Sequence, residues 1–400
     1  MRIIGRMAQA RRTPITESQL RGLKYFKKIL PLLNRLHHAG CQRDKAGQRT
    51  LHYDQYCALV LLFLLNPMVS SMRGLVQAST LQKVRRKLGV SPTSLGSFSE
   101  AVAVFDPALV QAVVAELAGE LKALPHDRRL DDVPGLLTLV DGTVVHALGR
   151  LLGQLQGARD IKLHTHFDLL AGVPADMDLT AATDSEIDNL LKRLLPDRLY
   201  VKDRGYACFR LFQAIIDIGS HFVCRIRDNS VYQLVEDRPL SAEAKVAGIV
   251  SDQVVWLGCA EKRGELKQPV RLIRIACTPH KNSRRGGRGG PAQGDSLLIA
   301  SDLLELPAEV IGLIYRCRWT VEIFFRFFKH VLGCRHLLSH RPDGIEIQVL
   351  MAILLCLLIT LWTRRKPTLR TVEMFRFYFA GWASEEELEA HIAKLQAATA

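Results

Sequence analysis

The region between residues 136 and 226 constrains the fold most, because short apolar runs alternate there with amphipathic segments in a fixed order. The periodicities predict the order β-β-β-α-β-α-β, with strands at 136–140, 144–148, 162–170, 199–202 and 221–226, and helices at 184–195 and 209–218. Asp141-Gly142 separates the first two strands and is typical of a hairpin turn. One acidic residue, Asp141, therefore ends the first strand, and another, Asp203, follows the fourth.

This order of strands is the one that an RNase H-like three-layer domain requires. In that topology the carboxyl end of strand four lies beside the middle of strand one, so we expect Asp141 and Asp203 to meet. Each residue also has an ordinary explanation, since Asp-Gly is common in turns and Asp203 can cap the helix that follows it. We predict an α/β fold with an RNase H-like mixed-sheet core.

A third carboxylate lies on the segment 311–336, which we expect to form one helix after Pro307 at its first turn. Helical spacing places four polar residues within roughly 60° of one another around the axis, with Arg326 beside them: Tyr315, Arg318, Glu322 and Lys329. Apolar residues cover the opposite side. The stripe taken alone could be an ordinary surface ladder of ion pairs around Glu322.

Asp141, Asp203 and Glu322 together form a set of hard oxygen donors, which is what two divalent ions require when they act on phosphate groups. The sequence therefore predicts a two-Mg²⁺ centre on these three residues, with Mn²⁺ as a possible substitute. Four further side chains would then follow the backbone of a bound nucleic acid and neutralise its phosphates: Tyr315, Arg318, Arg326 and Lys329.

The charge balance also favours a polyanionic partner. The chain carries 54 Lys and Arg against 40 Asp and Glu, a formal net charge of +14, which indicates nucleic acid before a membrane surface, although solubility alone can explain it. Nine cysteines form no CxxC pair and predict free thiols in a reducing cytosol. The apolar run 347–362 approaches the length of a membrane span, but we expect a buried core helix and no membrane partner.

Changes in composition divide the chain into four parts. We predict a helical N-terminal domain at 1–125, an RNase H-like core at 132–227 and 296–340, a β-rich insertion at 228–295, and C-terminal helices at 341–400. Within the insertion, 249–257 and 270–277 are strand-like, and the Gly/Arg-rich run 279–294 is typical of a mobile loop. The N-terminal helices could bind DNA or could serve only in packing or dimerisation.

The spacing Tyr315-x2-Arg318-x3-Glu322-x6-Lys329 resembles at every position the YREK motif of DDE transposases of the bacterial insertion-sequence type. The surrounding sequences agree with this resemblance, which extends over residues 50–365: LVDGT around Asp141, YVKDRGY around Asp203 and LLIASDL before the helix.

The resemblance implies that Asp141, Asp203 and Glu322 are the catalytic, metal-binding triad of a transposase. It further implies binding of the inverted-repeat ends of an insertion sequence, cut-and-paste cleavage and strand transfer on double-stranded transposon-end and target DNA, and a homodimer in the synaptic complex. The expected location is the bacterial cytosol, at the nucleoid when DNA is bound. The alternative is a non-catalytic DNA-binding protein derived from a transposase.

Overall fold

The computed structural model describes residues 14–19, 30–38, 44, 47, 49–121, 123–145, 161–181, 183–258, 265–277, 296–332, 338–339, 341–365 and 368–397. The Gly/Arg-rich run 279–294, for which the sequence predicts a mobile loop, lies outside these residues.

One mixed sheet of nine strands forms the centre of the molecule, in the order β3-β2-β1-β4-β5-β9-β8-β7-β6. The strands are β1 (Leu136–Val145), β2 (Ile161–Asp168), β3 (Val173–Ala181), β4 (Arg198–Lys202), β5 (His221–Ile226), β6 (Tyr232–Asp237), β7 (Ile249–Leu257), β8 (Val270–Ala276) and β9 (Ser296–Ser301). The first three form an antiparallel meander, β4 and β5 join it in parallel, and β9 returns antiparallel to β5. The first five strands thus have the arrangement expected of an RNase H-like core.

The predicted hairpin at Asp141-Gly142 is wrong, because β1 runs through both residues. Asp141 lies opposite Thr165 and Gly142 opposite His164 in one uninterrupted antiparallel ladder. Gly142 has no positive φ, whereas a two-residue hairpin turn of the Asn-Gly or Asp-Gly type needs one. The third strand of the meander is instead β3, which the sequence reading missed.

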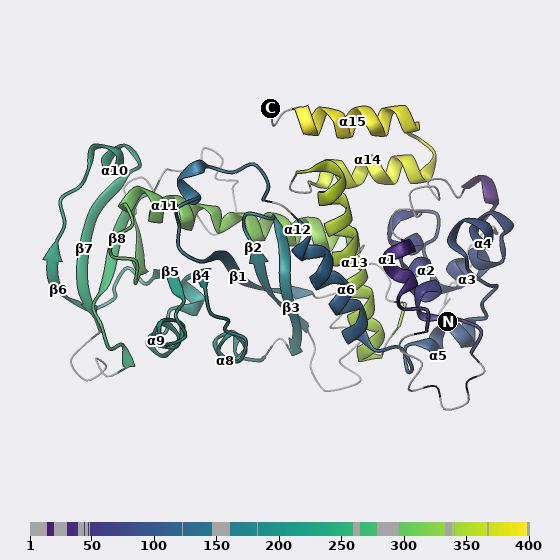
Figure 1. The fold of residues 1–400 in the computed structure, drawn as a ribbon, viewed down its shortest axis with the longest axis horizontal. Helices are drawn as coiled ribbons and strands as arrows, with labels where there is room; N and C mark the ends of the chain where they lie inside the picture. The colour runs from purple at the N-terminus through teal and green to yellow at the C-terminus, as the bar shows by residue number, and fades with distance from the viewer. Residues whose placement is uncertain are drawn as a thin grey trace, which may run out of the picture.

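Helices cover the two faces of this sheet (Figure 1). Helices α8 (Glu186–Lys192) and α9 (Phe209–Asp217) lie on one side, where Leu190, Phe212 and Ile215 share a core with Tyr200 of β4. On the other side, α11 (Ala308–Cys317) and α12 (Trp319–Leu332) bury Ile314 and Phe324 with Leu139 of β1 and Val201 of β4. Because side chains alternate along a strand, Asp141 shares its face with Leu139, toward α12.

The expected single helix at 311–336 is two helices. Arg318 lies between α11 and α12, and its backbone N–H donates to the carbonyl of Tyr315, three residues back. Hydrophobic periodicity cannot reveal such a tight turn, because the backbone stays in the right-handed helical region and the apolar stripe continues across it.

Strands β8, β7 and β6 extend the same sheet beyond β9, with α10 (Ala242–Val246) between β6 and β7. The strands expected at 249–257 and 270–277 are therefore present, and β8 pairs directly with β9. The β-rich segment continues the sheet of the core.

The N-terminal and C-terminal helices share one apolar core at the other end of the sheet, beside β3 (Figure 1). Their bounds are α1 (Leu30–Asn34), α2 (Tyr53–Leu65), α3 (Met72–Thr80), α4 (Gln82–Leu88), α5 (Leu95–Ala101), α6 (Pro107–Gly119), α13 (Pro342–Thr363), α14 (Leu369–Ala380) and α15 (Glu385–Ala397). Short 3-10 turns occupy Glu17–Gln19, Arg128–Leu130 and Arg204–Tyr206.

Among the described residues, α13 is the one helix that has the length and apolar composition to cross a membrane. It packs against α2, α6, α12 and β3, and 83% of its most apolar 18-residue stretch is buried inside the protein. The expected buried core helix is confirmed.

Candidate active site

Asp141 and Asp203 are brought to the same level of the sheet by the register of two parallel strands. Val140 of β1 lies opposite Lys202 of β4, so the next residue of each strand is one of the two aspartates. The carboxylate of Asp141 accepts the N–H of Gly142 at 2.8 Å, and that of Asp203 accepts the N–H of Arg204 at 2.7 Å. Asp203 therefore also caps the following 3-10 turn, as its position after a strand allows.

Glu322 enters from the other layer, in the first turn of α12. Arg318, in the turn between the helices, donates from Nη2 to Oε1 of Glu322 at 2.8 Å, and its guanidinium lies 5.8 Å from the ring centre of Tyr315. The hydroxyl of Tyr315 donates to Oδ1 of Asp203 at 3.3 Å. Helix α11 thus contacts Asp203 through Tyr315, and Arg318 holds Glu322 in the first turn of α12.

Burial raises the pKa of Asp141 to about 6, against the opposing effects of the Gly142 N–H and Arg318 and with further increases from Glu322 and Glu186. Burial alone would lower the pKa of Arg318, but Asp203, Tyr315 and Glu322 raise it overall. Arg318 is therefore a common counter-charge for the three carboxylates that the sequence predicts as a triad. It is also largely removed from solvent, with a side chain 12% exposed.

The four predicted DNA contacts divide into two pairs. Tyr315 is buried and Arg318 nearly so, and both touch the carboxylates. Arg326 and Lys329 lie farther along α12, where Arg326 is exposed and Lys329 half-buried. The guanidinium of Arg326 lies 5.8 Å from the ring centre of Trp319, whose side chain is 51% exposed.

Sequence reasoning missed Glu186 and Tyr206, which lie on the α8 side of Asp141 together with Lys162 of β2. Glu186 opens α8 behind the capping residue Ser185, and its Oε1 lies 2.9 Å from Nζ of Lys162 on β2. Tyr206 follows Asp203 by three residues and is 2% exposed. The feature of the sequence that could have indicated Glu186 is its place in the acidic first turn of α8. Acidic residues are common at the starts of helices, however, for reasons unrelated to catalysis.

The donors of this site are carboxylate oxygens, the type of ligand that Mg²⁺ and Mn²⁺ prefer. Within the described residues no three His, Cys, Asp or Glu side chains stand close enough together to hold an ion without rearrangement. The hydroxyl of Tyr206 is buried and approaches Glu186, but it makes no well-directed hydrogen bond among the described residues. The residue types thus fit a divalent ion.

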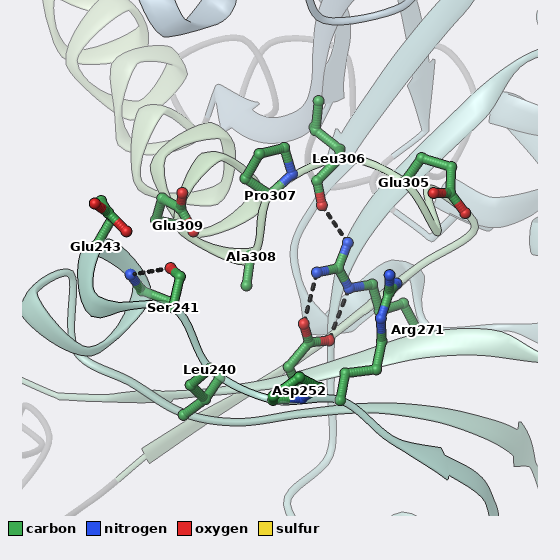
Figure 2. Close-up of a pocket in the computed structure, with 13 residues that line it drawn as sticks. Leu240, Ser241, Glu243, Asp252, Arg271, Glu305, Leu306, Pro307, Ala308 and Glu309 are labelled. Carbon is green, nitrogen blue, oxygen red and sulfur yellow. Dashed lines mark hydrogen bonds and ion pairs between the residues drawn. The ribbon is translucent and has the colours of Figure 1, made fainter.

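A separate cavity of about 350 Å³ lies at the opposite end of α11, where Pro307, Ala308 and Glu309 face the segment around Ser241 (Figure 2). Arg271 of β8 donates two hydrogen bonds to Asp252 of β7, at 2.7 and 2.6 Å. Figure 2 shows this pair. The same guanidinium donates to the backbone carbonyls of Leu303, Leu304 and Leu306 in the loop that leads to α11. This cavity marks a structural joint between the β-rich segment and α11.

Comparison with known proteins agrees with this arrangement. The family model described as a transposase DDE domain matches residues 134–359. Over 259 residues the chain is 26% identical to y4zB of Sinorhizobium fredii, named as a transposase, which covers 63% of this chain and 68% of that protein. It is 24% identical over 265 residues to the transposase named for insertion sequence element IS5377 of Geobacillus stearothermophilus. This match covers 64% of this chain and 65% of that protein.

A third relative, the transposase for insertion sequence element IS421 of Escherichia coli, is 24% identical over 252 residues, covering 56% of this chain and 64% of its own length. The matches thus span about two thirds of the length of these relatives. Among solved structures, the piggyBac transposase synaptic complex with hairpin DNA covers 93% of this chain and 84% of its own at a TM-score of 0.41 and 9% identity. The family match covers more than half of the chain, which therefore belongs to the DDE transposases of the bacterial insertion-sequence type.

Proposed function

We propose that this protein binds the inverted-repeat ends of its own insertion sequence and catalyses cut-and-paste cleavage and strand transfer. One observation carries the proposal: Glu322 of α12 is ion-paired with Arg318, whose positive charge also acts on Asp141 of β1 and on Asp203 at the end of β4. Three carboxylates on rigid elements beside a buried arginine suit the binding of phosphate and divalent ions better than an ordinary surface ion pair would.

Asp141, Asp203 and Glu322 would hold two Mg²⁺ ions, or Mn²⁺ in their place. When bound, such ions activate the attacking water or 3′-hydroxyl and stabilise the leaving oxygen. Tyr315 holds Asp203 through its hydroxyl, and Arg318 holds Glu322 while it keeps positive charge beside the reacting phosphate. Arg326 and Lys329 would neutralise phosphates farther along the bound transposon end.

The substrates would be double-stranded transposon-end and target DNA, and the assembled form a homodimer that holds two ends in one synaptic complex. The net charge of +14 supports a DNA partner, and the names of the relatives support transposition. The helical body formed by the N-terminal and C-terminal helices is a candidate for part of the DNA contact, because Arg85, Arg86 and Lys87 occupy the last turn of α4.

The test uses the genomic DNA that flanks the coding sequence on both sides, incubated with the full-length protein in Mg²⁺. Wild type should cleave at short inverted repeats, whereas Asp203→Asn and Glu322→Gln should bind the same ends without cleavage. Asp188→Asn is the matched control, because Asp188 is an exposed carboxylate that pairs with Arg210 on the far side of the sheet. Full cleavage by either triad variant would refute the mechanism, and binding without nicking by wild type would favour the non-catalytic alternative.

A further inference from the structure

Glu186 makes an unusually close approach to the backbone beside Asp141. A Cβ placed on Gly142 would lie 3.1 Å from Oε1 of Glu186 and 3.3 Å from Cδ of Lys162, which is tighter than ordinary van der Waals contact. Gly142 has no positive φ, so its glycine identity is not required by its backbone conformation. A side chain at position 142 would therefore displace the ends of Glu186 and Lys162 by a few tenths of an ångström, so glycine suits the position of this pair beside Asp141.

A second observation indicates that this place accommodates a ligand. Tyr206 is 2% exposed, and its hydroxyl approaches the carboxylate of Glu186 without a well-directed hydrogen bond to any described residue. A buried phenol without a partner usually costs about 1–3 kcal/mol, a cost that a bound ion with its waters would offset.

The charges around Asp141 are unevenly balanced. Arg318 pairs with Glu322 and Lys162 pairs with Glu186, while neither Asp141 nor Asp203 has an ion-pair partner within the part of the chain that the structure describes. Asp141 lies between Glu322, from the α12 side of the sheet, and Glu186, from the α8 side, and both charges act on it. Additional positive charge is therefore favourable here.

We propose that Glu186 is a fourth metal-binding carboxylate of this centre, which shares the divalent ions with Asp141. The inference rests on the proposed function, because it extends the same metal site. Lys162 then acts as the internal counter-ion that holds Glu186 in place before the metal binds. The ligand class is a hard divalent cation, Mg²⁺ or Mn²⁺, since each donor is a carboxylate oxygen.

The test measures binding of Mn²⁺ alone to the full-length protein without DNA, with free Mn²⁺ counted by electron paramagnetic resonance. Glu186→Gln should weaken Mn²⁺ binding by about tenfold or more. Asp188→Asn is the matched control two residues along the same helix, and it should bind like wild type. Lys162→Met should bind Mn²⁺ at least as tightly as wild type, because a competing cation is removed.

The role of Glu186 would be overturned if Glu186→Gln bound Mn²⁺ with wild-type affinity. It would also be overturned if Lys162→Met weakened Mn²⁺ binding as much as Glu186→Gln does, because the ion pair would then matter only structurally. Asp203→Asn separates this failure from that of the proposed function. If Asp203→Asn also keeps wild-type affinity, the whole metal centre is wrong. If it loses affinity while Glu186→Gln does not, the proposed function stands and only Glu186 is excluded.

Wild-type protein gives an independent readout that does not depend on the folding of a variant. Fe²⁺ substituted at the site, with ascorbate and peroxide, cuts the backbone near the bound ion. Fragments that end near residues 141, 203 and 322 and also near 186 are expected. Cuts at the first three positions without one near 186 would contradict the proposal.

Discussion

The hydroxyl of Tyr315 donates a hydrogen bond of 3.3 Å to Oδ1 of Asp203, a residue 112 positions earlier in the chain. Burial and the negative charge of Asp203 raise the pKa of Tyr315, so the phenol stays protonated and remains a donor at neutral pH. The contact joins the end of α11 to the end of β4. It adds a second hydrogen bond to a carboxylate that the N–H of Arg204 already holds at the end of its strand.

Tyr315→Phe removes this hydrogen bond and keeps the ring that packs in the core. We expect cleavage of transposon ends at saturating DNA to slow by about tenfold, because a hydrogen bond to a charged group contributes on the order of 1.5 kcal/mol. Single-turnover cleavage measures the rate, and a gel shift measures end binding. A weaker affinity with an unchanged rate would show instead that Tyr315 acts by contacting DNA.

Arg326→Ala tests the phosphate contacts on α12. Arg326 is exposed and stacks over Trp319, so its removal should leave the fold intact. We expect weaker DNA binding and a reduction of about 0.9 in the slope of log affinity against log salt, as for one lost phosphate contact. Arg210→Ala removes another exposed positive charge, from α9, and should leave that slope unchanged. Identical slopes for wild type and Arg326→Ala would exclude the contact.

Asp252→Asn tests the joint between the β-rich segment and α11. Arg271 is 4% exposed and Asp252 5%, so loss of the carboxylate leaves a buried, unpaired guanidinium. We expect the free energy of unfolding to fall by about 3–5 kcal/mol. Replacing both residues, as Asp252→Leu with Arg271→Met, should recover much of this loss.

Urea unfolding measures both variants of the joint. Asp188→Asn serves as control, because its exposed ion pair with Arg210 contributes about 0–1 kcal/mol. If Asp252→Asn is no less stable than this control, the buried pair does not hold the joint.

The meeting of Asp141 and Asp203 was predictable because it depends only on strand order. Once β1 and β4 are parallel neighbours, an acidic residue partway along β1 and one directly after β4 come together when their registers match. Glu322 followed from helical spacing and from the resemblance to the YREK motif. These arguments use local patterns and connectivity, which the sequence contains.

The wrong hairpin prediction and the features that were missed have a common cause, because tertiary contacts override the local sequence pattern at these positions. Asp141-Gly142 has the composition of a turn, but the ladder with β2 keeps it extended, and the glycine serves a close approach by Glu186. Strand β3 is only half-buried along most of its length and contains two aspartates, so its alternation is weak. Glu186 looks like an ordinary first-turn residue until the position of Gly142 is known.

His221 gives the fold a dependence on pH that is separate from the proposed metal site. A hydrogen bond of 2.6 Å to the buried carboxylate of Asp302, which also accepts the N–H of Phe222, raises the pKa of His221. Because the folded state favours the protonated imidazole, the stabilisation is fully present below the unfolded pKa of about 6.5 and is lost as the pH rises through the raised value. His221→Gln should therefore lower the melting temperature by about one to three degrees at pH 5.5 and by much less at pH 8.5. Differential scanning fluorimetry of both proteins in the same buffers measures this difference, and a melting-temperature gap that stays constant between the two pH values would show that the ion pair contributes nothing to stability.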